Sequence, residues 1–370
     1  MEKRRATMLK EGKFGLSEAV TLTTVLITSK IFVDTPRRIL QSGKTGAWLI
    51  PLISMAIALA GFLFIALFMK RFPGLTWVEA VNGAAGPVAG NAMNYLYLAF
   101  FFTLLSLTIR QFGETIILFA LPYFPISVII FFFLVTIIIA VLLGLEPIAR
   151  SLFIASPFML AAFFLVLLLL FPYYNIHNLF PLLGKPLDIA VGGLAGCSLY
   201  QEILFLALIM PVLQGWRFFI RAGITSIVLS GIIYMVFILI YLLVFPYEVG
   251  VELTSPYYSM ARTVYLGRFF QRLESLFLVI WVIIGVGKLS LLFYACLSTA
   301  ARIWKLKSYK PLVPCFTVFT FASAMLSPNM QVVSYLLQHI IFLFGGIPVF
   351  MAPLGLWLAA LVFKRGKTKA

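Results

Sequence analysis

The chain is poor in charge, histidine and cysteine. Of its 370 residues, 11% are charged, two are histidine and three are cysteine, and 12 acidic residues stand against 28 lysines and arginines. In contrast, 62% of the residues are hydrophobic and the mean hydropathy is +1.08. A soluble core could not bury so much apolar surface, whereas a lipid bilayer requires it. The composition therefore excludes a soluble globular domain and predicts an integral membrane protein.

The same scarcity excludes several kinds of site. His177 and His339 are isolated, and cysteine, histidine and carboxylate residues form no cluster, so we predict no metal site and no cofactor. The sequence has no phosphate-binding glycine loop, zinc-protease helix motif or nucleophile elbow, and we expect no enzymatic activity. Cys197, Cys296 and Cys315 lie in apolar stretches, and their odd number predicts no structural disulfide.

The apolar residues form blocks of helix length, without the two-residue alternation of a membrane barrel. The predicted fold class is therefore all-α and membrane-spanning, with a single transmembrane domain over residues 1–370. Ten spans are predicted, at 16–36, 47–69, 93–121, 126–144, 151–171, 188–213, 222–245, 272–300, 311–327 and 338–363.

Basic residues concentrate at the ends of these blocks, and no soluble domain carries them, which argues against nucleic-acid binding. With the N-terminus inside, 18 lysines and arginines fall on the cytoplasmic side and seven, including Arg37 and Arg38, on the outer side. The positive-inside rule then predicts that both termini are cytoplasmic. The remaining three basic residues, Lys30, Arg110 and Lys288, lie inside predicted spans.

A charge at the bilayer centre costs about 2.5–3.5 kcal/mol on insertion scales, so such residues usually face an interior path or site. Lys30 could hold a substrate carboxylate, take the place of a coupling cation, or extend to the outer headgroups. Glu202 could carry protons, neutralise Lys30 or Lys288, or belong to a structural ion pair. Arg110 and Glu114 are four residues apart on one helix face, which favours a structural pair that lowers the cost of inserting both.

Two spans have polar and small residues near their middle. The first contains Thr28-Ser29-Lys30, and the sixth contains Gly192-Gly193-Leu-Ala-Gly196-Cys197-Ser198. Such clusters predict interrupted helices, although glycines in the sixth span could also mark close helix packing. Interruptions at equivalent positions of two five-helix halves, here 1–171 and 186–363, indicate a transporter-type inverted repeat.

The predicted ligand site lies near the bilayer midplane, between spans one, three, six and eight. In span eight, small residues beside a cation in Gly285-Val-Gly287-Lys288 would let the lysine point into the bundle. The residues predicted to bind the ligand are Thr28, Ser29 and Lys30 from span one, Gly196, Cys197 and Ser198 from span six, and Gly287 and Lys288 from span eight.

Several motifs, in this order and spacing, resemble those of the endospore germination permeases, which are the integral-membrane B components of nutrient germinant receptors in the amino acid–polyamine–organocation superfamily. The motifs are Arg71-Phe-Pro-Gly-Leu-Thr-Trp-Val-Glu79, Arg110-Gln-Phe-Gly-Glu114, Pro256-Tyr-Tyr-Ser-Met-Ala-Arg262, Leu266-Gly-Arg-Phe-Phe-Gln-Arg-Leu-Glu274, Ile280-Trp-Val leading to Lys288, and Tyr309-Lys-Pro-Leu-Val313. The resemblance covers nearly the whole chain.

The resemblance implies a LeuT-like ten-helix bundle in the inner membrane of a spore, with helices 1 and 6 interrupted. It also implies recognition of an amino acid or similar small nutrient, and assembly with an A-type membrane subunit and a C-type lipoprotein. The chain departs from many relatives at the first break, where Ser29-Lys30 replaces a glycine-containing sequence. A proton-coupled amino acid transporter is the alternative, because the bundle alone does not reveal whether the ligand is moved.

Overall fold

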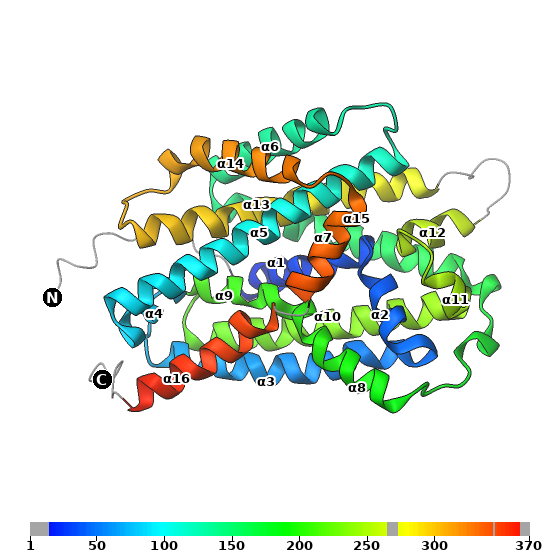
Figure 1. The fold of residues 1–370 in the computed structure, drawn as a ribbon, viewed down its shortest axis with the longest axis horizontal. Coiled ribbons are helices and arrows are strands. Elements are labelled where there is room, and N and C mark those ends of the chain that lie inside the picture. The colour runs from blue at the N-terminus through cyan, green and yellow to red at the C-terminus, as the bar shows by residue number, and fades with distance from the viewer. Residues whose placement is uncertain (1–14, 265–272, 343–344, 363–370) are drawn as a thin grey trace.

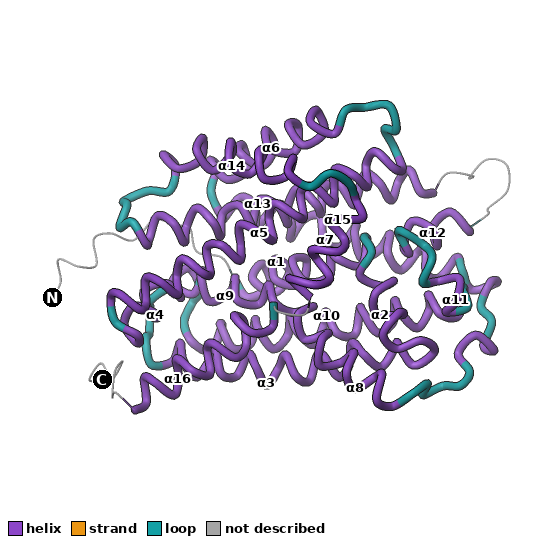
Figure 2. Tube along the Cα trace, viewed as in Figure 1, coloured by secondary structure: helices purple, strands orange, loops and turns teal. Residues whose placement is uncertain are grey.

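The computed structural model describes residues 15–264, 273–342 and 345–362, and all regular elements within these ranges are helical (Figures 1 and 2). Both predicted cytoplasmic termini, and residues 266–272 of the motif that ends at Glu274, lie outside the described residues. The first half of the chain contains α1 (Leu16–Thr28), η2 (Ser29–Phe32), α2 (Thr35–Gly43), η3 (Lys44–Leu49), α3 (Ile50–Lys70), α4 (Trp77–Ala85), α5 (Pro87–Phe119), α6 (Ile126–Leu143), α7 (Leu145–Leu169), η4 (Phe171–Tyr173) and η5 (Ile176–Leu179).

The second half contains a similar alternation of long helices and short helical turns. Its elements are α8 (Pro186–Ala195), η6 (Gly196–Ile203), α9 (Leu204–Leu208), η7 (Met210–Val212), α10 (Trp216–Val244), α11 (Tyr247–Gly250), α12 (Pro256–Thr263), α13 (Leu273–Ile303), η8 (Lys310–Leu312), α14 (Val313–Leu326), α15 (Met330–Leu336), η9 (Leu337–Phe342), η10 (Ile347–Met351) and α16 (Ala352–Val362).

Seven of the described helical stretches are long and apolar enough to cross a bilayer, and an eighth is obtained if a bent pair counts as one span. The pair, Lys310–Leu326 and Met330–His339, meets at an angle of 107°. The predicted first and last spans are not among the seven: α1 has only 13 residues, and Val349–Val362 is a shorter apolar helix. The chain is thus a multi-pass helical membrane protein, and the count of ten spans stays a prediction.

Glycine and proline mark where the long helices start. Gly86 and Gly144 have φ angles of +90° and +109°, which strongly favour glycine, and they precede α5 and α7. Pro51, Pro87 and Pro186 occupy the first turn of their helices, where a missing backbone N–H costs no hydrogen bond. Most connecting loops consequently lie at the two ends of the bundle (Figure 2).

Helix α1 occupies the interior of the bundle, where it packs against α7, α10 and the η6 segment (Figure 1). Its residues Leu22, Leu26 and Ile27 are fully buried. Around it, α3 and α10 approach so closely at Gly223 that an added Cβ would overlap the ring of Phe62. The polar residues that follow α1 are therefore held at the centre of the protein and not at its lipid surface.

Candidate ligand-binding site

The first break places polar side chains and free backbone groups inside the bundle. The α-helix ends at Thr28, a single 3-10 turn follows, and Val33 is extended before α2 begins. Hydroxyl groups from other elements satisfy two carbonyls of this region: Tyr234 donates to the carbonyl of Ile27 at 3.0 Å, and Ser255 donates to the carbonyl of Phe32 at 3.2 Å. Neighbouring helices thus replace hydrogen bonds that a continuous helix would make itself.

Helix α12 contacts the same break through an aromatic pair. The rings of Phe32 and Tyr257 meet edge to face, with centroids 5.0 Å apart. Together with the hydrogen bond from Ser255, this contact ties the start of α12 to the residues that follow Lys30. The break is therefore linked to an outer helix of the bundle.

The sixth span changes from α-helix to 3-10 helix at Gly196. Ser54 on α3 donates to the carbonyl of Gly193 at 2.9 Å. At Gly196, an added Cβ would overlap the hydroxyl of this serine, and at Gly193 it would overlap Ile53. These glycines lie at the change of helix type, which we call the second break, and they also pack closely against α3. Pro186–Leu208 nevertheless forms one helical stretch of span length.

An ion triad connects the two breaks. The ammonium group of Lys30 lies 2.7 Å from Glu202 Oε2 and donates to the carbonyl of Leu199, also at 2.7 Å. On the other side of the carboxylate, Lys288 Nζ lies 3.5 Å from Glu202 Oε1. The Glu202 side chain is fully buried, and the two lysine side chains are 15% and 2% exposed, so one buried carboxylate is paired with two cations inside the protein.

A second charged cluster lies on the α2 side of Lys30. Asp34 Oδ2 accepts from Arg38 Nη2 at 2.6 Å and from Nε at 3.2 Å, while Asp34 Oδ1 accepts from Gln111 Nε2 at 2.8 Å. All three residues are buried. The sequence analysis counted Arg38 among the outer basic residues, whereas the structure places it inside the bundle. The spacing of four residues between Asp34 and Arg38 could have indicated this ion pair, because Arg110 and Glu114 have the same spacing.

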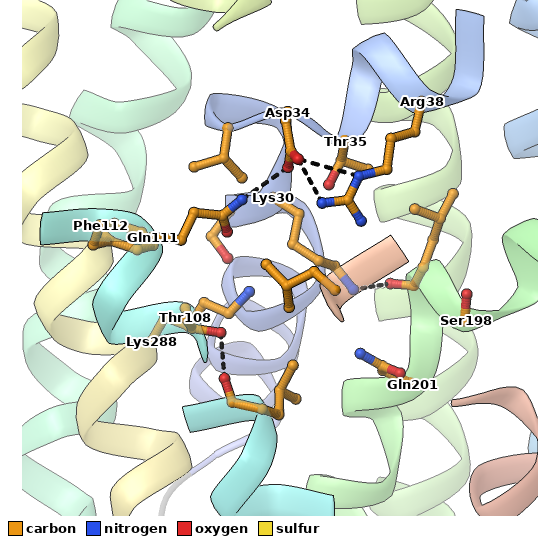
Figure 3. Close-up of a pocket in the computed structure, with 15 residues that line it drawn as sticks. Lys30, Asp34, Thr35, Arg38, Thr108, Gln111, Phe112, Ser198, Gln201 and Lys288 are labelled. Carbon is orange, nitrogen blue, oxygen red and sulfur yellow. Dashed lines mark hydrogen bonds and ion pairs between the residues drawn. The ribbon is translucent and has the colours of Figure 1, made fainter. Parts of the chain in front are cut away.

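These clusters surround one cavity, which lies between the two breaks (Figure 3). The cavity is small, with about 40 Å³ open to the centres of water molecules. Figure 3 shows Arg38 approaching from α2, Gln201 from η6, and Lys288 with Thr108 from the opposite side. The lining residues are Ser29, Lys30, Val33, Asp34, Thr35, Arg38, Leu104, Thr108, Gln111, Phe112, Ser198, Leu199, Gln201, Lys288 and Leu337.

Four of the eight predicted ligand-binding residues line this cavity, and four do not. Ser29, Lys30, Ser198 and Lys288 are among the lining residues, whereas Thr28, Gly196, Cys197 and Gly287 are not. The hydroxyl of Thr28 bonds its own helix at Thr24, and Gly196 packs against α3. Cys197 lies next to Gly346, and Gly287 lies against Leu152 in an apolar groove between α6, α7 and α13.

Sequence reasoning missed Asp34, Arg38, Thr108, Gln111 and Gln201. Gln111 belongs to a motif that was noticed only for its two charged residues, and Gln201 directly precedes Glu202. Both side chains are neutral, so the criterion of a charge inside a span does not identify them. Among the described residues, no group of three or more His, Cys, Asp or Glu side chains could hold a metal ion.

Arg110 and Glu114 form a buried pair away from the cavity wall. Glu114 Oε1 accepts from Arg110 Nη2 at 2.7 Å and from Nε at 2.9 Å. The guanidinium group also donates to the carbonyl of Ala324 at 3.3 Å and to that of Pro328 at 3.2 Å. These carbonyls lie at the 107° bend between α14 and α15. Arg110 therefore binds backbone groups that the bend frees, and it positions the helix that leads to Leu337.

Comparison with known proteins decides the family. A family model described as "Spore germination protein" matches residues 16–332. The chain belongs to this family. Spore germination protein KB of Bacillus subtilis is 25% identical over 267 residues, which are 71% of this chain and 72% of that protein. Spore germination protein YndE of the same organism is 23% identical over 324 residues, covering 86% of this chain and 89% of the relative.

A solved structure shows the same fold. Mhp1, a nucleobase-cation-symport-1 family transporter in a closed conformation with bromovinylhydantoin bound, superposes with a TM-score of 0.62 at 14% identity, covering 96% of this chain and 95% of the transporter chain. The resemblance read from the sequence motifs is confirmed by the family match. This spore germination family protein is a multi-pass membrane protein with a transporter-like fold, and neither its family nor these relatives are enzymes.

Proposed function

We propose that this protein is a germinant receptor subunit that binds an amino acid or similar small nutrient in the cavity between its two breaks. The observation that carries the proposal is the shared lining of this cavity. Ser29 and Lys30 from the first break, Ser198 from the second and Lys288 from α13 surround one buried polar space. Polar groups that converge in a mostly apolar bundle are typical of a small-molecule site.

Ligand binding would favour one arrangement of the halves 1–171 and 186–363 over another. The ion pair between Lys30 and Glu202 joins one half to the other, so a ligand that contacts Lys30 changes the interaction between them. A ligand shifts such an equilibrium only by its differential affinity for the two states. We propose that an A-type membrane subunit and a C-type lipoprotein receive this shift, in the inner membrane of a spore, with both termini of this chain cytoplasmic.

The test uses full-length protein in proteoliposomes and a panel of labelled amino acids and small organic acids, scored for saturable binding and for uptake under a proton gradient. Binding without uptake is expected. Ser198→Ala should weaken binding, whereas Ser156→Ala, on α7 and outside the cavity lining, should not. Absence of saturable binding of any compound would contradict the proposal.

A proton-coupled transporter is the second candidate, and two observations favour it. The fold neighbour is a transporter, and Glu202 is a fully buried carboxylate paired with Lys30, which lines the cavity. Saturable uptake that depends on the gradient and is lost in Glu202→Gln would establish transport and not sensing alone.

A further inference from the structure

The cavity contains more positive than negative side chains. Three cations line it, Lys30, Arg38 and Lys288, and Asp34 is the one carboxylate among the lining residues, since Glu202 is not part of the lining. Asp34 accepts three hydrogen bonds, from Arg38 and Gln111, and Glu202 lies between the two lysines. A ligand with one net negative charge would balance the three cations against the two carboxylates.

Several donors around the cavity have unused capacity. Lys288 has its nearest acceptor at 3.5 Å, and Arg38 Nη1 has no hydrogen-bond partner among the described residues. The amide of Gln201 is 2% exposed and faces the cavity, and neither of its polar atoms is hydrogen-bonded to another described residue. A buried amide without partners is costly, so this side chain needs a group that can both donate and accept.

We infer that the ligand is a small 2-hydroxy acid anion and not a zwitterionic amino acid. Its carboxylate would accept from Lys288 and Arg38, and its hydroxyl would donate to or accept from Gln201. The inference rests on the proposed function, since it names the class of compound that the same cavity takes. The side chain must be short, because only about 40 Å³ of the cavity is open to the centres of water molecules.

An ammonium group fits this cavity poorly. It would lie among three cations, and the acceptors left for it among the lining residues are neutral, because Glu202 does not line the cavity. The hydroxyls of Thr108 and Ser198 already donate to the carbonyls of Leu104 and Ala195, so toward a ligand they can act only as hydrogen-bond acceptors. The amine of an amino acid therefore gains hydrogen bonds but no opposite charge, whereas a hydroxyl at that position brings no charge to be repelled.

The experiment compares L-lactate with L-alanine, which differ in the hydroxyl and ammonium groups, on full-length protein in nanodiscs by calorimetric titration. Lactate is expected to bind at least about tenfold more tightly. Lys288→Met removes the excess charge, so the ratio of the two affinities should fall by about tenfold or more. Lys288→Arg keeps the charge and should keep the preference for lactate.

The ratio of the two affinities is informative even if a variant is less stable, because both ligands meet the same protein. Alanine binding as tightly as lactate to the unmodified protein would overturn the inference and leave the proposed function intact. A lactate preference that Lys288→Met does not change would overturn the assignment of the excess charge. Absence of binding by both compounds would overturn the inference, and the wider panel above would then decide the proposed function separately.

Discussion

The hydroxyl of Tyr234 on α10 donates a hydrogen bond of 3.0 Å to the carbonyl of Ile27, in the last turn of α1. Both residues are fully buried. The carbonyls of a final helical turn have no partner in their own helix, so α10 supplies one where the first span is interrupted. The break is thus stabilised by its neighbour and does not depend on the local sequence alone.

Tyr234→Phe should destabilise the protein by about 1–3 kcal/mol, because it leaves a buried carbonyl without a donor. The measurement is the thermal unfolding midpoint of the purified protein in detergent. Amide exchange at the residues after Ile27 should increase in the same variant. Tyr123→Phe is the matched control, since the Tyr123 side chain is 96% exposed and its hydroxyl has no described partner. Equal shifts in both variants would contradict this account.

Lys30→Met should destabilise the protein by about 3–5 kcal/mol, because it removes one partner of a buried ion pair and leaves Glu202 Oε2 and the carbonyl of Leu199 without their donor. Glu202 would retain only Lys288, at 3.5 Å. The double variant Lys30→Met with Glu202→Gln should recover part of the loss, measured as the unfolding midpoint. Lys70→Met, at the exposed end of α3, tests for any general effect of removing a lysine and should be nearly neutral. No recovery in the double variant would show that the pair is not the source of the loss.

Arg110→Lys should open the bend between α14 and α15. A lysine keeps the charge but not the planar group that donates to Glu114, Ala324 and Pro328 together. A cysteine placed at buried Ser327, in a background without the native cysteines, should then react faster with a maleimide. Glu114→Gln, which keeps the arginine, should raise the rate less. Unchanged reactivity in Arg110→Lys would mean that the bend does not need this contact.

Gly223→Ala should cost about 1–3 kcal/mol, because the new methyl group overlaps the ring of Phe62 and α3 and α10 must separate. Gly355→Ala on α16 is the control, since an added Cβ there meets no atom within 4 Å. A better helix former at that position should be neutral or slightly stabilising. The unfolding midpoints of the two variants are compared, and a smaller loss at Gly223 than at Gly355 would refute the packing argument.

The helical membrane fold could be predicted from the sequence because apolar runs long enough to span a bilayer are typical of transmembrane helices. The sequence also located the two breaks near Ser29 and Gly196, since polar and small residues at mid-span are rare. It did not predict the short first helix or the burial of Arg38. These depend on hydrogen bonds between distant elements, such as that of Tyr234 with the carbonyl of Ile27 and that of Gln111 with Asp34, and no local pattern records such partners.

Only part of the cavity lining could be predicted from the sequence. Charges inside spans pointed to Lys30 and Lys288, because a mid-membrane charge needs compensation. The neutral Gln111 and Gln201 carry no such signal. Small residues were misleading where they serve packing: Gly287 lies against Leu152, outside the cavity, although it directly precedes Lys288.

The contacts of Phe32 with Ser255 and Tyr257 have a thermodynamic consequence. If a ligand changes the conformation of the first break, it also changes the relative free energies of the positions that α12 can occupy, because α12 contacts that break. Linkage between two sites is reciprocal: a molecule that binds α12 tenfold more tightly in the ligand-bound arrangement would raise the ligand affinity tenfold. The nutrient concentration at which the protein responds would then be adjustable from outside the cavity, without any change to the residues that line it.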